Sequence, residues 1–109
     1  MASTVLVGHG LRRIEEMAYY AGIIDGEGCI SYYKSLGVSV EGLYPKTLIE
    51  MHTVFGGSVS EIKRINKRRY YRWRIYGQDA GRCLQMLLPY LREKKEQAEV
   101  ELEAMCYPK

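Results

Sequence analysis

Two acidic residues, Asp25 and Glu27, lie among glycines in the segment 20–28, which reads YAGIIDGEG. The apolar periodicity before them predicts a helix that ends at about Asp25, so both acids stand at its C-terminal end. The helix dipole disfavours negative charge there by roughly 0.3–1 kcal/mol per acid, so a compensating interaction is expected. A divalent cation would supply it, because hard cations bind carboxylate and carbonyl oxygens, including the carbonyl of Gly26. The alternative, from spacing alone, is that both acids are simply exposed at a helix end.

Positive charge is concentrated in one segment of the chain. Residues 62–76 read IKRINKRRYYRWRIY and contain seven basic residues and no acidic one, although the formal net charge is only +3. The C-terminal stretch is rich in glutamate instead. This asymmetry indicates that one region binds anions and the other does not. The basic residues are Lys63, Arg64, Lys67, Arg68, Arg69, Arg72 and Arg74.

The elements that must position these charges follow from hydrophobic periodicity and turn residues. The pattern predicts helix, hairpin, helix, hairpin and two helices, which is an α+β arrangement of four antiparallel strands with helices on one face. In the third strand, Val59 and Ile62 cannot both point inward without a β-bulge. The expected helices are 11–25, 45–55, 80–88 and 89–104, the last beginning at Pro89, and the expected strands are 29–35, 37–41, 59–65 and 70–76.

The sheet face away from the helices should be polar and basic. A solvated surface is the simpler alternative, because antiparallel sheets often expose one face to water. The density of arginine and tyrosine in the second hairpin exceeds what solubility requires and favours nucleic acid. With the period of two along strands, this face carries Ser31, Tyr33, Ser35, Ser39, Glu41, Ser60, Arg72, Arg74 and Tyr76.

The first helix has two apolar faces. One runs through Ile14, Met17, Ala18 and Ala21, and the other through Tyr20, Ile23 and Ile24. A helix that is apolar on two sides must be buried on two sides, and the chain's own sheet covers only one of them. A second copy is a natural candidate for the other side. The small residues Ala18, Ala21 and Gly22 would let two helices approach closely.

Several classes of protein and site are not indicated. Cys29, Cys83 and Cys106 are odd in number and form no C-x-x-C pair, which predicts reduced thiols in a cytosol-like compartment. His9 and His52 are isolated, so a zinc cluster is not expected. No apolar run reaches the ~18 residues of a membrane span, and no signal peptide is recognised. We expect a cytoplasmic protein, associated with a nucleoid in bacteria or phage, with an organellar matrix as the alternative.

The segment YAGIIDGEG resembles the LAGLIDADG motif of homing endonucleases. The resemblance continues through GCIS at 28–31, FGGSV at 55–59, YRWRIYG at 71–77 and LPYLREKKEQAEVELE at 88–103. It covers about Tyr19 to Glu103, nearly all of the folded part. It implies a single domain over 1–109, with residues 1–10 as an extension, in the αββαββαα fold whose sheet forms a DNA-binding saddle. It also implies a gene carried by a mobile intron or intein.

The resemblance further implies a site-specific endonuclease that acts on double-stranded DNA. Chains with one motif form homodimers, whose motif helices pack along the two-fold axis and bring both copies of Glu27 together under the DNA. Glu27 is then the catalytic metal-binding acid and the Gly26 carbonyl a further ligand, whereas Asp25 is expected to act near the helix end, largely structurally. The implied cofactor is Mg²⁺, with Mn²⁺ or Ca²⁺ substituting in binding. Neither a membrane nor a small-molecule substrate is expected.

Lys94 is the basic residue expected at the reaction centre. The last helix has an inward stripe through Leu91 and Ala98, and Lys94 falls on it. The alternative is a lysine that extends its ammonium outward to solvent. The family resemblance, at PYL-x-x-K, implies a base partner or transition-state cation here, with Lys95 as the fallback.

The sequence departs from the family after the second strand. Family members often have an amide there, whereas this chain has Glu41 and Gly42, so Glu41 either substitutes for the amide or interferes. A second hypothesis is therefore a non-cleaving DNA- or RNA-binding relative, such as a regulator or an intron maturase. A third is a basic α+β domain with neither role. For the first hypothesis, Arg72 and Arg74 are expected at guanine edges, and the remaining basic residues of 62–76 at phosphates.

Overall fold

The computed structural model describes residues 2–32, 34–66 and 68–106. Side chains are described for these residues except 2–12, 63–65 and 106. Tyr33 and Lys67, two expected DNA-binding residues, lie outside the described residues, as do the side chains of Lys63 and Arg64.

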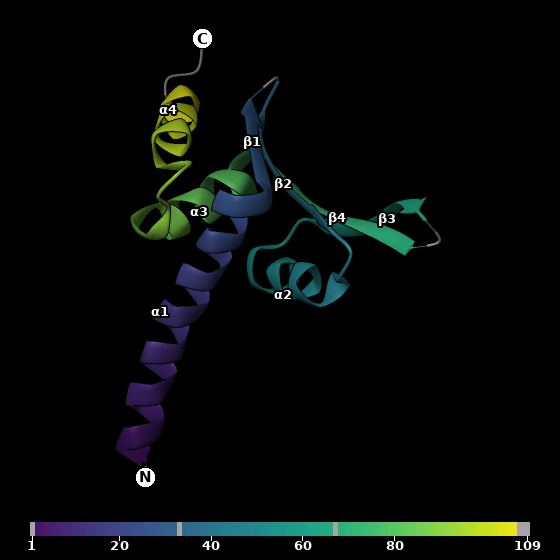
Figure 1. Cartoon of the computed structure of the whole chain (residues 1–109). Coiled ribbons are helices and arrows are strands. Elements are labelled where there is room, and N and C mark those ends of the chain that lie inside the picture. The colour runs from purple at the N-terminus through teal and green to yellow at the C-terminus, as the bar shows by residue number, and fades with distance from the viewer. Residues whose placement is uncertain (1, 33, 67, 107–109) are drawn as a thin grey trace.

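The expected order of elements is confirmed (Figure 1). The first helix and hairpin are α1 (Ala2–Glu27), β1 (Gly28–Tyr32) and β2 (Leu36–Gly42). After α2 (Pro45–Phe55), the second hairpin is formed by β3 (Ser58–Ile65) and β4 (Arg68–Tyr76). The chain ends with α3 (Gly77–Leu87), the short 3₁₀ helix η1 (Leu88–Tyr90) and α4 (Lys95–Cys106).

Several boundaries differ from those expected from the sequence, three of them near the first helix, the first strand and the last helix. The first helix begins at Ala2 rather than at residue 11, and at 1.5 Å per residue its 26 residues span about 39 Å. Its N-terminal half projects beyond the other elements (Figure 1). The first strand ends at Tyr32, so Ser35 lies in a bend and not in the strand. Pro89 does not start the last helix, because η1 and a short loop precede Lys95.

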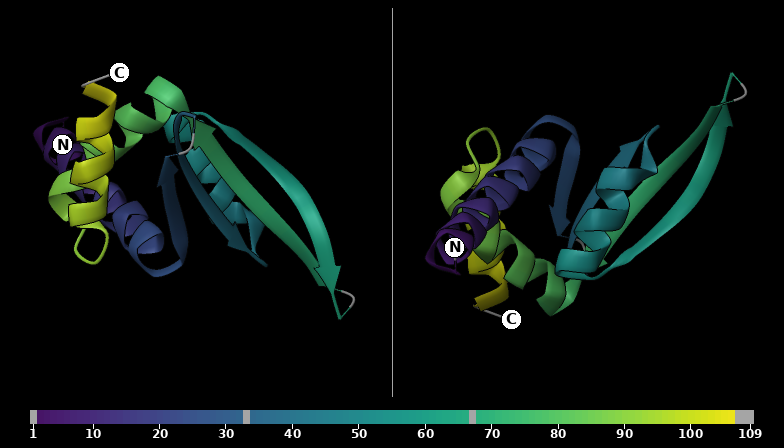
Figure 2. Two further views of the ribbon diagram at one scale, coloured as in Figure 1. Left: turned by 90° about the horizontal axis from the view of Figure 1, so that it is seen from above. Right: turned by 90° about the horizontal axis from the view of Figure 1, so that it is seen from below.

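The four strands form one antiparallel sheet in the order β1-β2-β4-β3. The two hairpins therefore meet along β2 and β4, where Val38 pairs with Ile75 and Val40 with Trp73. A register shift falls in β3 between Glu61 and Lys63, in the strand where Val59 and Ile62 would need a bulge if both are to point inward. The β3–β4 hairpin extends past the helices as an arm (Figure 2).

The helices cover one face of this sheet, and Trp73 lies at the centre of the resulting core. Its side chain is completely buried, its ring packs against Phe55, and its indole N–H donates to the Gly56 carbonyl at 2.9 Å. The next residue, Gly57, has a φ of +82°, and a Cβ there would lie 2.2 Å from the Arg74 carbonyl oxygen. Only glycine allows this close approach, so the end of α2 is fixed against the strand that carries the arginines.

The burial of α1 separates an inward from an outward face. Met17, Tyr20, Ala21 and Ile24 are buried in the chain's own core, following the i, i+3, i+4, i+7 pattern. Ala21 was expected at a dimer interface, and this is wrong, because its side chain is fully covered within one chain. The outward face is formed by Ile14, Ala18, Tyr19 and Gly22, all exposed. In the part of the chain that the structure describes, no helix is both long and apolar enough to cross a membrane.

Candidate active site and nucleic-acid face

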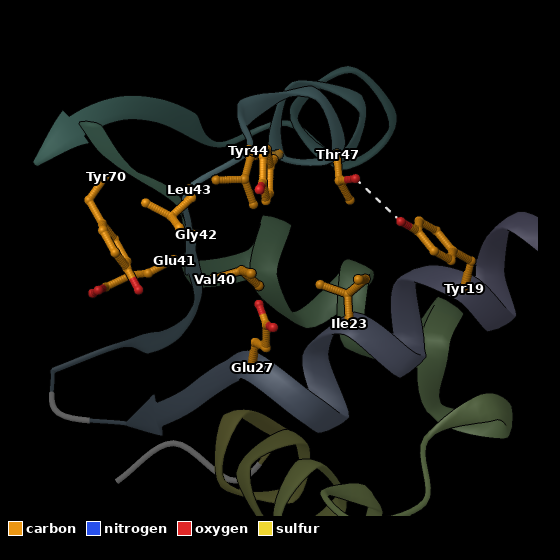
Figure 3. Close-up of a pocket in the computed structure, with 11 residues that line it drawn as sticks. Tyr19, Ile23, Glu27, Val40, Glu41, Gly42, Leu43, Tyr44, Thr47 and Tyr70 are labelled. Carbon is orange, nitrogen blue, oxygen red and sulfur yellow. Dashed lines mark hydrogen bonds between the residues drawn. The ribbon is translucent and has the colours of Figure 1, made fainter. Parts of the chain in front are cut away.

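Glu27 lies at the junction where α1 passes directly into β1. The turn depends on Gly28, because a Cβ at that position would lie 2.8 Å from both the Cα and the carbonyl oxygen of Ile24. A side chain cannot be placed there without moving the helix, so the final glycine of the YAGIIDGEG segment is sterically required. The junction leaves Glu27 exposed at the helix end, with its carboxylate directed toward Val40 across a pocket (Figure 3).

This pocket is an open hollow of about 540 Å³ between α1, the end of β2 and the start of α2. Glu27 and Ile23 contribute from α1 (Figure 3). At the far end the hydroxyls of Tyr19 and Thr47 lie 3.3 Å apart and connect α1 to α2. The residues that line it are Tyr19, Ile23, Glu27, Val40, Glu41, Gly42, Leu43, Tyr44, Thr47, Leu48 and Tyr70. A carboxylate at the edge of an open hollow is accessible to a ligand as large as a phosphodiester.

Tyr20 makes a second connection between α1 and α2. Its hydroxyl donates to Glu50 Oε1 at 3.2 Å, and burial together with the negative charge of Glu50 raises the pKa of Tyr20 to about 12. The phenol therefore stays protonated and keeps donating at any physiological pH. This bond holds the pocket wall formed by α1 in a fixed position relative to α2.

Asp25 is engaged by the protein itself. Its two carboxylate oxygens accept the backbone N–H groups of Arg92, at 2.8 Å, and Lys94, at 3.0 Å. Its backbone carbonyl accepts the Lys94 ammonium at 2.7 Å. These three bonds tie the loop 91–94 to the end of α1. They also explain why an acid is tolerated at a helix C-terminus, because a cation beside the last carbonyls compensates the dipole.

The sequence pattern predicted that Lys94 lies on a stripe of the last helix, and this is wrong. It precedes α4, and its carbonyl accepts the N–H of Ala98 at 2.8 Å at the start of that helix. The chain leaves the helical conformation at Leu91 and passes through a bend and a turn, and its N–H groups at Arg92 and Lys94 bind Asp25 there. The ammonium nevertheless stays at the α1 end, half-buried and bound two residues before Glu27. Lys95, the fallback residue, is exposed in the first turn of α4.

The donors at the α1 end fit a hard divalent cation in part. Among residues 2–32, 34–66 and 68–106, three or more His, Cys, Asp or Glu side chains do not gather into a metal-binding group. Glu27 is one exposed carboxylate, and the last carbonyls of α1 lack helical partners, with open space around Gly26. Mg²⁺ and Ca²⁺ take about six or more oxygen ligands. One chain supplies too few, so phosphate oxygens, water or a second copy must complete the shell.

The sheet face opposite the core carries the predicted polar residues in register. Arg72 lies opposite Glu41 on β2 and Ser60 on β3, while Arg74 lies opposite Ser39 and Ser58. Ser31, Ser60, Arg74 and Tyr76 are exposed. The Tyr76 ring covers Gly37, where a Cβ would lie 3.2 Å from two ring carbons.

One pairing on this face was not foreseen. The Arg72 Nε and Nη2 atoms donate to the same oxygen, Oε2 of Glu41, at 2.9 and 2.7 Å. Among the described residues, Arg74 makes no ion pair. Toward the arm, Arg68 and Arg69 are exposed, and Arg69 lies 3.5 Å from the carboxylate of Glu61.

Sequence reasoning missed some residues of the pocket. Tyr70 shares the parity of Arg72 along β4 and could have been placed on the polar face by the period of two. Tyr19, Tyr44 and Thr47 carry no comparable signal, because the packing of α1 beside α2 brings them to the pocket.

The sequence matches no protein-family model and no curated protein. Solved structures do match. The homing endonuclease I-CvuI with its target in the presence of calcium is 24% identical with a TM-score of 0.69, over 84% of this chain and 66% of that one. An archaeal intron-encoded homing endonuclease, I-Vdi141I, complexed with DNA is 15% identical with a TM-score of 0.67, over 86% of this chain and 69% of that one. The homing endonuclease I-TnaI is 17% identical with a TM-score of 0.59, over 83% and 71%.

These matches confirm the fold that the sequence resemblance implied. The chain has the αββαββα(α) architecture of LAGLIDADG homing endonucleases, with its four-stranded antiparallel sheet. It spans 66% of the length of the I-CvuI chain, slightly under two thirds.

Proposed function

We propose that this chain is a homing-type DNA endonuclease that acts as a homodimer and cuts both strands of a pseudo-palindromic site with Mg²⁺. The observation that carries the proposal is the exposed Glu27 carboxylate at the end of α1, in a fold whose solved relatives are homing endonucleases, two of them described with DNA. The sheet face beside it presents arginine, serine and tyrosine side chains, which suits a nucleic-acid ligand.

DNA binding uses the sheet as a β-ribbon reader in the major groove. Arg72 takes a guanine edge, which presents two acceptors to a guanidinium. Arg74, which was also expected at a guanine, takes a phosphate instead. The other basic residues of the segment 62–76, which are Lys63, Arg64, Lys67, Arg68 and Arg69, take phosphates and position the duplex without reading it. Ser31, Ser35, Ser39, Glu41, Tyr33 and Tyr76 supply the remaining polar contacts.

Dimerisation uses the outward face of α1. Ala18 and Gly22 are exposed one turn apart, and no atom lies within 4 Å of the position a Cβ would take at Gly22. Ile14 and Tyr19 are each 53% exposed on this face, which leaves a large apolar area uncovered in one chain. Packing this face against its copy buries that area and brings the two Glu27 side chains to a common axis.

In the proposed mechanism, each α1 end serves one DNA strand. Glu27 and the Gly26 carbonyl would hold the cation, which when bound would supply an activated water and stabilise the leaving oxygen. The Lys94 ammonium, held by the Asp25 carbonyl, stabilises negative charge that develops on the phosphate. Asp25 acts as a positioning residue, because its carboxylate is occupied by backbone N–H groups and fixes the loop that carries Lys94.

One observation favours a second function, DNA or RNA binding without cleavage. Gly42 lines the pocket where the family resemblance implies an amide, and it has no side chain to order a water molecule. Glu41 cannot readily replace that amide, because its carboxylate is bound by Arg72.

The deciding experiment is digestion of a randomised duplex library by the full chain with Mg²⁺. Site-specific double-strand cuts that disappear in Glu27→Gln support the endonuclease. Glu99→Gln, on the exposed surface of α4, is the matched control and should cut normally. Sequence-selective binding without cutting by the wild type would instead establish the second function.

A further inference from the structure

Arg72 and Arg74 point to the same face of β4 but have different neighbours. Arg74 stands between two serines, Ser39 and Ser58. Arg72 lies between Ser60 and Glu41 and forms an ion pair with Glu41, whereas Arg74 forms none with the described residues. Arg72 and Arg74 thus occupy equivalent positions on β4, one paired with a carboxylate and the other not. Comparing the two arginines therefore shows what Glu41 contributes.

The geometry of the pair leaves the end of the guanidinium free. Nε donates its only hydrogen and Nη2 donates one hydrogen, both to Glu41 Oε2. Of the five guanidinium N–H donors, three remain: the second on Nη2 and both on Nη1. Adjacent donors on Nη1 and Nη2 are the ones that can reach the O6 and N7 acceptors of guanine together. Binding to Glu41 is thus compatible with simultaneous reading of a base.

The pair also changes what the arginine contributes to binding. The side chains of Arg72 and Glu41 are 26% and 39% exposed, so they are partly shielded and held against the sheet. A guanidinium whose orientation is fixed beforehand loses less conformational entropy when it meets a base. Its charge is meanwhile balanced by the carboxylate, so it adds little to the sequence-independent attraction between basic side chains and phosphates.

We propose that Glu41 is a specificity-determining positioning residue, which orients Arg72 toward a guanine in each half-site and suppresses its contribution to non-specific binding. This inference rests on the proposed DNA-binding function. It gives Glu41 a task distinct from that of the amide expected after the second strand, and it makes Arg72 the selective arginine and Arg74 the electrostatic one.

The test is Glu41→Gln in the full chain, measured by binding to a selected duplex and to an unrelated duplex over a range of salt concentrations. Glutamine keeps the shape of the side chain and removes the charge. We expect affinity for the unrelated duplex to rise several-fold and the slope of log K against log salt to steepen by about 0.9 for each released arginine. Preference for guanine at the Arg72 position should fall roughly fivefold or more, the lower limit for loss of a good bidentate contact.

Two matched variants separate this role from a merely structural one. Glu99→Gln, which removes a carboxylate from the exposed surface of α4, should leave both the salt slope and the guanine preference unchanged. In an Arg72→Ala background, Glu41→Gln should no longer change guanine preference, because the residue it orients is gone. Circular dichroism melting of each variant checks that the fold is retained.

The outcomes are distinguishable. A wild-type chain that binds no duplex would overturn the proposed function, and this inference with it. A wild type that binds, together with a Glu41→Gln variant that keeps its guanine preference and its salt slope, would overturn the inference alone. An effect of Glu41→Gln that persists undiminished without Arg72 would also overturn it.

Discussion

The α1 end and the sheet face each carry two charged residues of like sign, acidic at the α1 end and basic on the sheet. At the α1 end there are two acids, and Asp25 is saturated by backbone N–H groups while Glu27 is exposed. On β4, at two positions of the polar sheet face, Arg72 is bound by a carboxylate while Arg74 is exposed. In each region one charged group is bound by the protein itself, and its neighbour of like charge is exposed. Residue type alone does not tell the two roles apart; the partners do.

The largest effect should come from the exposed acid. Glu27→Gln should lower the cleavage rate at least about 100-fold, because even outer-shell partners of a metal cost 10–100-fold in affinity or activity. DNA binding and the melting temperature should be nearly unchanged, since Glu27 has no described protein partner to lose. Cleavage of a fixed target under single-turnover conditions, with melting in parallel, checks both. A marked loss of stability in Glu27→Gln would show that Glu27, like Asp25, helps to hold the fold together.

The engaged acid should show the converse behaviour. Asp25→Asn weakens the bonds to the N–H groups of Arg92 and Lys94, and bonds of this kind to a charged group contribute about 1.5–3 kcal/mol. We expect the free energy of unfolding to fall by about that amount, measured by urea denaturation. Glu93→Gln, in the same loop and exposed, is the control. Equal stability of Asp25→Asn and wild type would show that the loop is held by other contacts.

On the sheet, the two arginines should separate in their salt dependence. Arg74→Ala should reduce the salt slope of DNA binding by about 0.9 per subunit, while Arg72→Ala should change it much less because Glu41 already balances that charge. Equal reductions of the salt slope in Arg72→Ala and Arg74→Ala would show that Glu41 does not balance the charge of Arg72.

The smallest expected effect concerns Tyr20 at alkaline pH. Its folded pKa of about 12 lies above the ordinary value of 10.0, so above pH 10 the unfolded chain loses this proton first. Stability should therefore decline as pH rises from about 10 to 12, and the contribution is fully present below pH 10. Tyr20→Phe should flatten this decline in thermal melts, at a cost of about 0.5–1.5 kcal/mol for the bond to Glu50. An unchanged alkaline profile would place the titrating group elsewhere.

Local pattern predicted most of the fold. The order of the elements and the polar parity of β2 and β4 follow from periods of 3.6 and 2 along the chain. The start of α1 at Ala2 could not be predicted in this way. Gly8 and Gly10 each cost a helix about 1 kcal/mol, so they normally indicate that the helix begins after them.

The sequence offered candidate residues for the site but not the pairings between them. Asp25 reaches the loop at Lys94 across 69 positions, and Glu41 reaches Arg72 across 31. The second pair requires β2 to lie beside β4, which no local signal specifies. Tertiary contacts therefore decide which acid and which arginine are bound by the protein itself.

Mixed dimers give the most direct test of the claim that each subunit's Glu27 serves one DNA strand. Wild-type and Glu27→Gln chains, differently tagged and purified as a heterodimer, are incubated with a supercoiled plasmid that carries the selected site. We expect a nicked circle from the heterodimer, a linear product from the wild-type dimer and no cut from the dimer that carries Glu27→Gln in both subunits. A heterodimer that still linearises the plasmid as fast as the wild type would contradict it.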